Sequence, residues 1–371
     1  MPTKPSYLQA AATIPLLAAL LILISAGCSV NEGRITKTGD IPAGYADTTY
    51  YIDDNDEPQL AITYRDASLF REGLAVVKND GNYGYIDDDG EMTLPDIYKS
   101  ATIFRNGKAW AVRSGSAPGV INRKGETKFT LGQAIEAEIF YEGLARFTAK
   151  ESGDIRYGFV TDEGETTVPA IYYGATRFSN GLASVEDMNG KWGYINTKGE
   201  AVIPATFDAA GTFDKEGYAI VRTDNKYGII DKNGKYILQP VFEWLEKDGQ
   251  HYIATREGKY GWSDRKGEWI IEPQYRNALR FFDAELAPVQ LSGGRWGYIN
   301  KKGKIKIKEQ FDEAYPFVGN KALVKVGPYY GFINGDGKYV INPGYTWISP
   351  DYISNAVNGE PYYTKVQTDL K

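Results

Sequence analysis

The sequence Lys-Trp-Gly-Tyr-Ile-Asn-Thr-Lys-Gly-Glu, residues 191–200, determines how the rest of the chain is interpreted. It returns almost unchanged at residues 295–304, as Arg-Trp-Gly-Tyr-Ile-Asn-Lys-Lys-Gly-Lys. Looser copies run along the chain at intervals of 33 to 39 residues, with the motif glycine at Gly84, Gly119, Gly158, Gly193, Gly228, Gly261, Gly297 and Gly331. A regular period of this length indicates a repeat architecture.

One repeat divides into short strands joined by turns. Alternating side chains predict a first strand over 192–196, and Ala201-Val202-Ile203 forms the next, which we expect to stop at Pro204 because proline cannot donate to a β-ladder. A link with a pair of aromatic residues leads to a return strand, as in residues 181–185. Each unit is therefore predicted to be a three-stranded antiparallel meander of about 35 residues.

The turn between the first two strands follows the pattern Asn/Asp-x-x-Gly. Asn or Asp suits the first position of a type I turn, and glycine suits the left-handed position that closes a hairpin. The pattern occurs at residues 87–90, 122–125, 196–199, 231–234 and 300–303. Asp53 to Glu57 and Asp87 to Glu91 could also ligate calcium, but neither carries the full loop signature, so we interpret them as turn residues.

About nine such units run from residue 49 to the C-terminus. The first is degenerate, with Tyr51-Ile52-Asp53 in place of the motif, and the last keeps a return strand at 362–366. Aromatic residues that recur in nearly every unit are expected to pack between units and not to contact a ligand. They are Tyr83, Tyr157, Trp192, Tyr227, Tyr260, Trp296 and Tyr330.

The combined pattern resembles the WG-repeat family of bacterial proteins. Trp/Tyr-Gly-Tyr/Phe-Ile-Asn/Asp-x-x-Gly is followed by Ile-x-Pro and then by Phe-x-x-Gly-Leu-Ala-x-Val. Ala117-Pro118-Gly119 departs from the pattern because the aromatic residue is lost. The resemblance implies an all-β repeat fold and no fixed catalytic residues. We expect units stacked as an open curved solenoid, with degenerate ends as caps; the alternative is a closed propeller-like ring.

The N-terminus predicts export and anchoring. Residues 1–27 combine Lys4, an apolar run from Leu16 to Ile24 and small residues before Cys28, which resembles the lipobox of a bacterial lipoprotein signal peptide. This resemblance implies cleavage before Cys28 and its lipidation. The alternative is an uncleaved membrane helix; both interpretations place the rest outside the cytoplasm. Residues 28–48 are expected to be a flexible tether and 49–371 the WG-repeat β domain.

Composition excludes several classes of function. The formal net charge is −6, without the basic stripe that nucleic acid requires. One cysteine and one histidine argue against zinc and against Cys-His or Ser-His-Asp catalysis, and His251 fits a strand. We therefore expect no catalytic residues, no metal and no cofactor. A glycan-active hydrolase, which would use two carboxylates, is the less favoured alternative.

Differences between the units are the best guide to a ligand. Two residues after the turn glycine, the chain carries Met92, Thr127, Thr166, Ala201, Tyr236, Trp269, Ile305 and Tyr339. Tyr236, Trp269 and Tyr339 are the ligand-binding candidates, as an aromatic platform for a glycan or peptide; alternatively, these rings pack on the neighbouring unit. The sequence thus predicts a membrane-anchored binding or scaffold protein with a protein or glycan partner, or a cell-wall-binding module.

Overall fold

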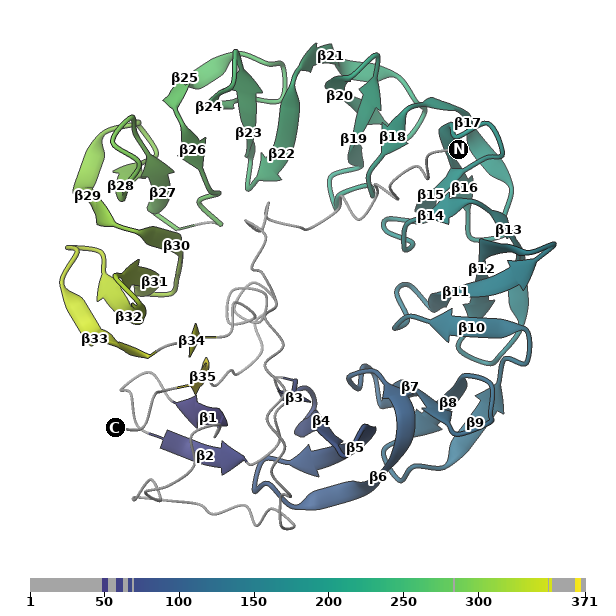
Figure 1. Cartoon of the computed structure of the whole chain (residues 1–371). Coiled ribbons are helices and arrows are strands. Elements are labelled where there is room, and N and C mark those ends of the chain that lie inside the picture. The colour runs from purple at the N-terminus through teal and green to yellow at the C-terminus, as the bar shows by residue number, and fades with distance from the viewer. Residues whose placement is uncertain are drawn as a thin grey trace. The chain divides into compact units, whose positions relative to one another are not determined.

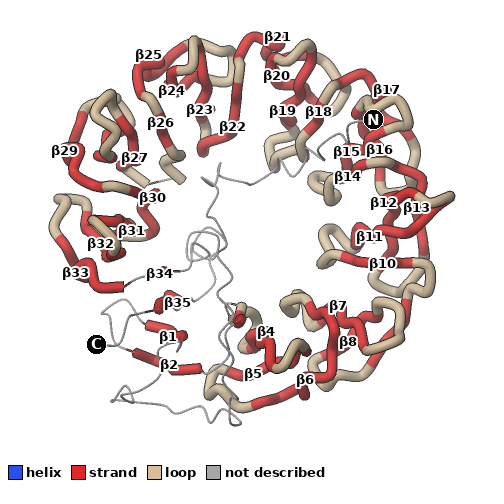
Figure 2. Tube along the Cα trace, viewed as in Figure 1, coloured by secondary structure: helices blue, strands red, loops and turns tan. Residues whose placement is uncertain are grey.

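The computed structural model describes residues 49–52, 58–62, 66–68, 70–282, 284–345, 347–348 and 364–367. Every regular element within these ranges is a β-strand (Figure 2), and none of them contains a helix that could span a membrane. The predicted signal segment, Cys28 and the tether lie outside the described residues. The described residues form two compact units: one contains residues 141–240, and the other contains the described residues before 141 together with those after 240.

Four-stranded antiparallel sheets in tandem make up most of both units (Figure 1). The sheet around the motif at 191–200 consists of β14 (Gly174–Ala175), β15 (Leu182–Glu186), β16 (Trp192–Asn196) and β17 (Ala201–Phe207), in that order. The following sheet repeats the order with β18 (Ala209–Ala210), β19 (Tyr218–Thr223), β20 (Lys226–Asp231) and β21 (Tyr236–Phe242). The predicted all-β tandem repeat is confirmed.

The same order holds before and after these two sheets. The later sheets contain β22 (Trp244–Asp248), β23 (His251–Arg256), β24 (Lys259–Ser263) and β25 (Trp269–Tyr275); β26 (Asn277–Ala278), β27 (Leu286–Gln290), β28 (Trp296–Asn300) and β29 (Ile305–Phe311); and β30 (Glu313–Val318), β31 (Lys321–Val326), β32 (Tyr329–Asn334) and β33 (Tyr339–Tyr345). An earlier one contains β10 (Ala134–Ala137), β11 (Leu144–Glu151), β12 (Asp154–Thr161) and β13 (Thr166–Tyr172).

Two repeats near the start of the described chain share one seven-stranded sheet. It contains β3 (Asp66–Ala67), β4 (Leu74–Asn79), β5 (Asn82–Asp87), β6 (Met92–Ala101), β7 (Lys108–Arg113), β8 (Gly119–Asn122) and β9 (Thr127–Thr130). They are joined because β6 continues into the link and pairs with β7, where Ala101 lies opposite Ala111. The second of these repeats is the one in which Pro118 replaces the motif aromatic.

The predicted count of three strands per unit is wrong by one. The link contributes a short fourth strand, in which Gly174 pairs with Glu186 and Ala175 with Val185. A return strand has two edges, and the aromatic-Gly strand occupies only one of them. The extended link therefore satisfies the backbone hydrogen-bonding groups on the other edge. A strand of only two residues is too short for an alternating pattern of side chains to reveal it in the sequence.

The strand predicted to stop at proline continues through it. β17 runs from Ala201 to Phe207 and includes Pro204. Tyr194 lies opposite Ile203 and Trp192 opposite Phe207, so the register shifts across the proline. β17 is the last strand of its sheet, and the N–H group that proline lacks is not needed at an irregular position on such an edge. The prediction of a strand end at this proline is therefore wrong.

The register shift explains the motif glycine. A Cβ atom placed on Gly193 would lie 2.5 Å from the carbonyl oxygen of Ile203 and 2.7 Å from the backbone nitrogen of Ala205. These distances are shorter than real Cβ contacts, so no side chain fits between the two strands without a backbone shift. The close approach lies within one sheet, between β16 and β17.

The Asn/Asp-x-x-Gly turns have the predicted geometry. Gly199 has φ of +82°, and its N–H donates to the carbonyl of Asn196. The Asn196 side-chain oxygen accepts the N–H groups of Lys198 and Glu200 at 3.0 Å each. Asp87 plays the same part by accepting the N–H of Glu91. The turn interpretation of this acidic cluster is confirmed; the cluster at 53–57 lies outside the described residues.

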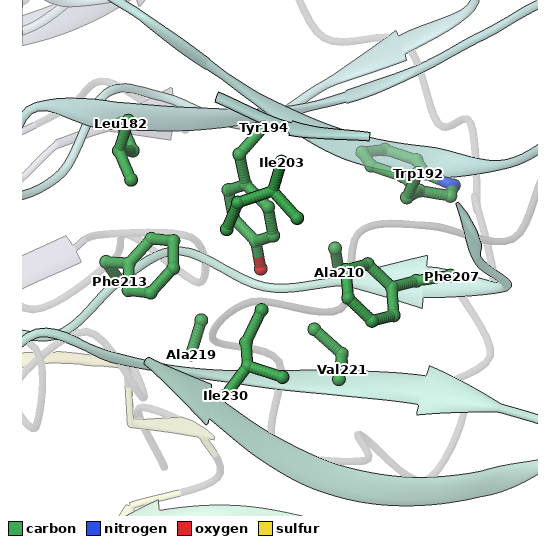
Figure 3. Close-up of a cluster of buried hydrophobic side chains, with 10 residues drawn as sticks. All are labelled: Leu182, Trp192, Tyr194, Ile203, Phe207, Ala210, Phe213, Ala219, Val221 and Ile230. Atoms are coloured by element: carbon green, nitrogen blue, oxygen red, sulfur yellow. The ribbon is translucent and has the colours of Figure 1, made fainter. Parts of the chain in front are cut away.

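Aromatic and aliphatic side chains fill the space between successive sheets. Figure 3 shows one such cluster in the unit 141–240, where the rings of Tyr194, Phe207 and Phe213 lie among aliphatic side chains. The centroids of Tyr194 and Phe213 are 4.7 Å apart, and the Tyr194 hydroxyl donates to the carbonyl of Gly211 at 2.8 Å. Since Tyr194 and Gly211 belong to adjacent repeats, this bond joins them as well as satisfying a buried polar group.

The two ends of the repeat region share one sheet, of order β2 (Pro58–Ile62), β1 (Thr49–Ile52), β35 (Thr364–Gln367) and β34 (Trp347–Ile348). Tyr51 lies opposite Lys365 in the β1–β35 pair. The return strand predicted at 362–366 is thus present over 364–367, and it pairs with the degenerate first repeat. The first and last repeats therefore contribute strands to one sheet and do not form two separate caps.

Candidate binding surface

Tyr236 and Trp269 are half-buried and pack on the preceding repeat. The Tyr236 ring lies 6.3 Å from that of Phe207, and its hydroxyl is 3.0 Å from the Thr223 hydroxyl. Trp269 lies 5.2 Å from Phe242 in an edge-to-face contact. These contacts correspond to the alternative in which the rings pack between units, so both side chains support the fold whatever else they contact.

Tyr339 differs from the other two candidates. It is the first residue of β33, and 43% of the side chain is exposed. Met92 and Ile305 occupy the same position in their repeats and are similarly exposed, at 38% and 44%. Each of the three predicted residues begins the last strand of a different sheet, and Tyr339 is the most exposed of the three.

The bulky Trp269 is matched by a small neighbour across the strand pair. Ser263 lies opposite Trp269, at the position where other repeats carry isoleucine, such as Ile195 opposite Ala201. Ser263 is fully buried, and its hydroxyl has no hydrogen-bond partner among the described residues. Arg256 lies over the Trp269 indole, 5.1 Å from its centroid, and covers part of the exposed side.

A group of charged residues between the sheets β22–β25 and β26–β29 was missed by sequence reasoning. Asp248, on β22, is 6% exposed and accepts three hydrogen bonds. Its Oδ2 accepts from Trp262 Nε1 and from the Phe281 N–H, each at 2.8 Å, and its Oδ1 accepts from the Phe282 N–H at 3.1 Å. One carboxylate therefore satisfies an indole in its own sheet and two backbone donors of the next repeat.

Glu246 completes this joint. Its Oε1 lies 3.1 Å from Arg280 Nε in a half-buried ion pair between adjacent repeats. Burial raises the pKa of the Glu246 carboxyl, the guanidinium of Arg280 opposes that rise, and the charge of Asp248 adds to it. Burial also raises the pKa of the nearby Tyr260 hydroxyl, with a smaller contribution from Glu246. Both carboxylates are engaged in joining repeats.

The sequence did contain a signal for this joint. Asp248 stands where other links have phenylalanine, as at Phe178, Phe213, Phe281 and Phe317. A buried carboxylate in place of a core ring requires hydrogen-bond donors around it. Asp248 therefore stands out when the links of the repeats are aligned position by position. His251, three residues later, begins β23 and is exposed, which agrees with its predicted place in a strand.

Other carboxylates join neighbouring repeats in a similar way. Glu72 accepts the N–H groups of Asn106 and Gly107, at 2.5 Å and 2.9 Å. Glu142 accepts those of Asn180 and Gly181, at 2.6 Å and 2.9 Å. In both cases a turn of one repeat binds the corresponding turn of the next, so these acids have a structural role.

A third half-buried group involves the motif aromatic Tyr330. Glu313 lies 2.7 Å from Lys325 and accepts from the hydroxyls of Tyr315 and Tyr330 at 3.0 Å and 3.2 Å. The side-chain hydrogen bond to Glu313 raises the pKa of Lys325, and burial raises that of Tyr330. Within the described part of the chain, no group of three or more His, Cys, Asp or Glu residues is arranged to hold a metal ion.

The recurring aromatics lie in or against the core, as predicted. Trp192 and Trp296 are buried. The tyrosines at the same position are half-buried: Tyr83, Tyr157, Tyr227, Tyr260 and Tyr330. The exposed and variable part of each repeat is instead the hairpin between its third and fourth strands, together with the exposed positions of the fourth strand. These hairpins are the candidate binding surface.

Comparison with known structures supports the fold. A crystal structure described as the eukaryotic initiation factor is 9% identical, with a TM-score of 0.54 over 75% of this chain and 87% of that chain. BamB from Moraxella catarrhalis is 10% identical, with a TM-score of 0.38 over 90% and 96%. The WD40 β-propeller domain of Doa1 is 11% identical, with a TM-score of 0.31 over 70% and 94%. At these identities only the first likeness bears on the fold, and none bears on function.

No curated protein matches the chain significantly. The family model described as "WG containing repeat" matches it in eight segments, at residues 51–83, 83–115, 157–192, 192–227, 227–247, 260–294, 296–327 and 330–354. The gap between 115 and 157 contains the repeat in which Pro118 replaces the aromatic, and the gap after 247 begins at Asp248. Because the matched segments cover more than half of its length, the chain belongs to the WG containing repeat family.

Proposed function

We propose that this protein is a lipid-anchored, extracytoplasmic bacterial protein that binds or scaffolds a partner through its β-repeat surface and has no catalytic activity. One observation supports the binding role most directly. Residues that recur from repeat to repeat, such as Tyr194 and Ile203, are buried in the core. Residues that differ between repeats lie on exposed hairpins, so the repeated fold presents a surface that can vary without loss of stability.

The non-catalytic assignment is supported by the structural role of several acidic side chains. Asp248 and Glu246 join adjacent repeats through hydrogen bonds and an ion pair. Glu72 and Glu142 bind backbone N–H groups of the next turn. A glycosidase would need two carboxylates free to reach a sugar at a set separation. In each of these cases the carboxylate has another, structural partner.

The anchor is proposed from the N-terminal sequence. Small residues before Cys28 resemble a lipobox, and residues 29–48 would hold the repeat domain away from the bilayer. Several acyl chains on one cysteine, at about 0.8 kcal/mol per buried methylene, give firm attachment. Growth with a radiolabelled fatty acid tests this: the full chain should incorporate label and fractionate with membranes, and Cys28→Ala should abolish the incorporation, whereas Ser29→Ala should not. Labelling that persists in Cys28→Ala would refute the anchor.

Binding of a glycan is the second candidate, favoured by the exposed ring of Tyr339. Aromatic faces stack on sugar rings, and this ring is not covered by a neighbouring repeat to the extent that Trp269 is. Sedimentation of the full chain with insoluble cell-wall polysaccharide, before and after Tyr339→Ser, tests it. Loss of binding in the variant supports the glycan module. Equal sedimentation of the two proteins excludes a role for Tyr339, and an absence of sedimentation leaves the protein scaffold as the proposal.

A further inference from the structure

Two hairpins of the array carry opposite charge at the same positions of the repeat. The acidic hairpin, residues 87–96, contains Asp87, Asp88, Asp89, Glu91 and Asp96 and no cation, a net charge of −5. The basic hairpin, residues 300–309, contains Lys301, Lys302, Lys304, Lys306 and Lys308 with Glu309, a net charge of +4. The corresponding ten residues of the other repeats carry between −4, in the degenerate first repeat, and +2.

The two hairpins share one backbone geometry. The Gly90 N–H donates to Asp87 O at 2.9 Å, and the Gly303 N–H donates to Asn300 O at 2.8 Å. Register is also the same: Ile86 lies opposite Met92, and Ile299 opposite Ile305. The difference in charge therefore comes from side chains alone and not from a difference in turn structure.

The charges are available at the surface. All five lysines of the basic hairpin are exposed, as are Asp88, Asp89 and Glu91 of the acidic one. Lys301 forms an ion pair with the highly exposed Glu285 at 2.9 Å. Among the described residues, the other four lysines form no ion pair. Lys304 directly precedes β29, and Lys306 and Lys308 alternate along it about 6.7 Å apart, so their mutual repulsion is relieved when an anionic partner binds.

Each hairpin also exposes one aliphatic side chain in the middle of its charges. Met92 is 38% exposed in the acidic hairpin, and Ile305 is 44% exposed at the same position of the basic hairpin. Exposed apolar side chains next to charged residues are typical of a protein–protein contact. A lipid headgroup layer or a soluble polyanion would match the lysines but would leave Ile305 without an apolar partner.

We propose that the basic hairpin docks on the acidic hairpin of a second copy of this chain. The contact pairs lysines of one copy with carboxylates of the other and places Ile305 against Met92. It joins two different surface patches, so it is heterologous and leaves one free hairpin of each kind at the ends of a dimer. Further copies can then add in the same way. The lipid anchor is not required, although copies held on one membrane would meet at a higher effective concentration.

Charge reversal tests the contact in the full chain, purified in a zwitterionic detergent. One variant carries Lys302→Glu and Lys304→Glu, and the other carries Asp88→Lys and Glu91→Lys. Exposed charge pairs are individually weak, so each double reversal should reduce self-association about tenfold in sedimentation velocity at low salt. Lys198→Glu, in the homologous neutral hairpin, is the matched control and should change nothing. Association of the wild type should also fall between about 20 mM and about 500 mM salt.

Mixing the two variants is the decisive arm. The lysine variant keeps the −5 hairpin but its other hairpin is neutral, and the acidic variant keeps the +4 hairpin but its other hairpin falls to −1. The mixture restores one pair of −5 and +4, so only the mixture should recover association. If the mixture fails to associate while the wild type does, the hairpins do not contact each other and the proposal is wrong. It is equally wrong if the wild type stays monomeric at low salt. Cosedimentation with vesicles containing phosphatidylglycerol gives a further check: if the lysine variant loses vesicle binding but self-associates like the wild type, the proposal is also wrong. None of these results bears on acylation of Cys28.

Discussion

Asp248 offers a direct test of how one repeat is held to the next. Replacement by alanine removes the acceptor of three hydrogen bonds, from Trp262 Nε1 and from the N–H groups of Phe281 and Phe282. A buried donor without a partner costs about 1–3 kcal/mol, and loss of one member of a buried charged network costs about 3–5 kcal/mol. We therefore expect Asp248→Ala to lower the free energy of unfolding by about 3–5 kcal/mol.

The effect should be local to the joint. Hydrogen exchange read by mass spectrometry on the intact chain should show faster exchange in peptides covering β22 and residues 277–282, where the two backbone donors lie. Peptides from the unit 141–240 should exchange as in the wild type. Asp248→Asn keeps one acceptor oxygen but loses the charge, so its effect should be smaller than that of alanine.

Glu272→Gln is the matched control. Glu272 lies on β25 of the same sheet, and its exposed side chain pairs with Arg256 at 3.0 Å. Exposed ion pairs contribute about 0–1 kcal/mol, so this change should be close to neutral. If Asp248→Ala is as mild as Glu272→Gln, or if its effect on exchange is uniform along the chain, the assignment of Asp248 as an inter-repeat joint is refuted.

Three further predictions follow from the same geometry. Gly193→Ala should destabilise by about 1–3 kcal/mol or more in urea unfolding because a Cβ would overlap β17, whereas Gly132→Ala, where the Cβ would meet open space, should be tolerated. The raised pKa of Glu246 means that the folded state binds its proton more tightly than the unfolded chain does, so its contribution to stability is present below the unfolded pKa and is lost as pH rises through the folded pKa. Unfolding measured across that window should show this loss in the wild type and not in Glu246→Gln; a contribution that instead grows with pH would contradict the assignment. Trp269→Ser should cost about 2–4 kcal/mol because the indole packs on Phe242, and Tyr339→Ser less than about 1 kcal/mol; comparable thermal shifts for the two would show that their burial does not differ as described.

Local patterns predicted the elements of this fold well because the physical causes are local. Hairpin turns depend on a few consecutive residues. In the turn at 196–199, Asn196 supplies the side-chain acceptor and Gly199 takes the left-handed conformation. Strand alternation likewise depends on near neighbours in sequence. The number of strands per sheet was wrong because Gly174 and Ala175 form a strand only when the return strand lies beside them.

The candidate site was less predictable for the same reason. Sequence could identify Tyr236, Trp269 and Tyr339 as departures from the repeat, but their exposure depends on what the preceding repeat places opposite them. Phe207 and Phe242 cover two of the rings, and Tyr339 remains open. Asp248 was overlooked because its three donors come from residues 14 to 34 positions further along the chain.

The sequence by itself determined the period, the turns and the burial of the recurring aromatic residues against the core. It could do so because the same residue types return at the same positions in nearly every repeat. Tertiary structure alone decided why the motif contains glycine: β17 continues past Pro204 and its backbone presses against Gly193. It also decided that residues from the two ends pair in one sheet, as Tyr51 does with Lys365. Hydrogen bonding between distant strands follows from the three-dimensional path of the chain, and no local pattern encodes that path.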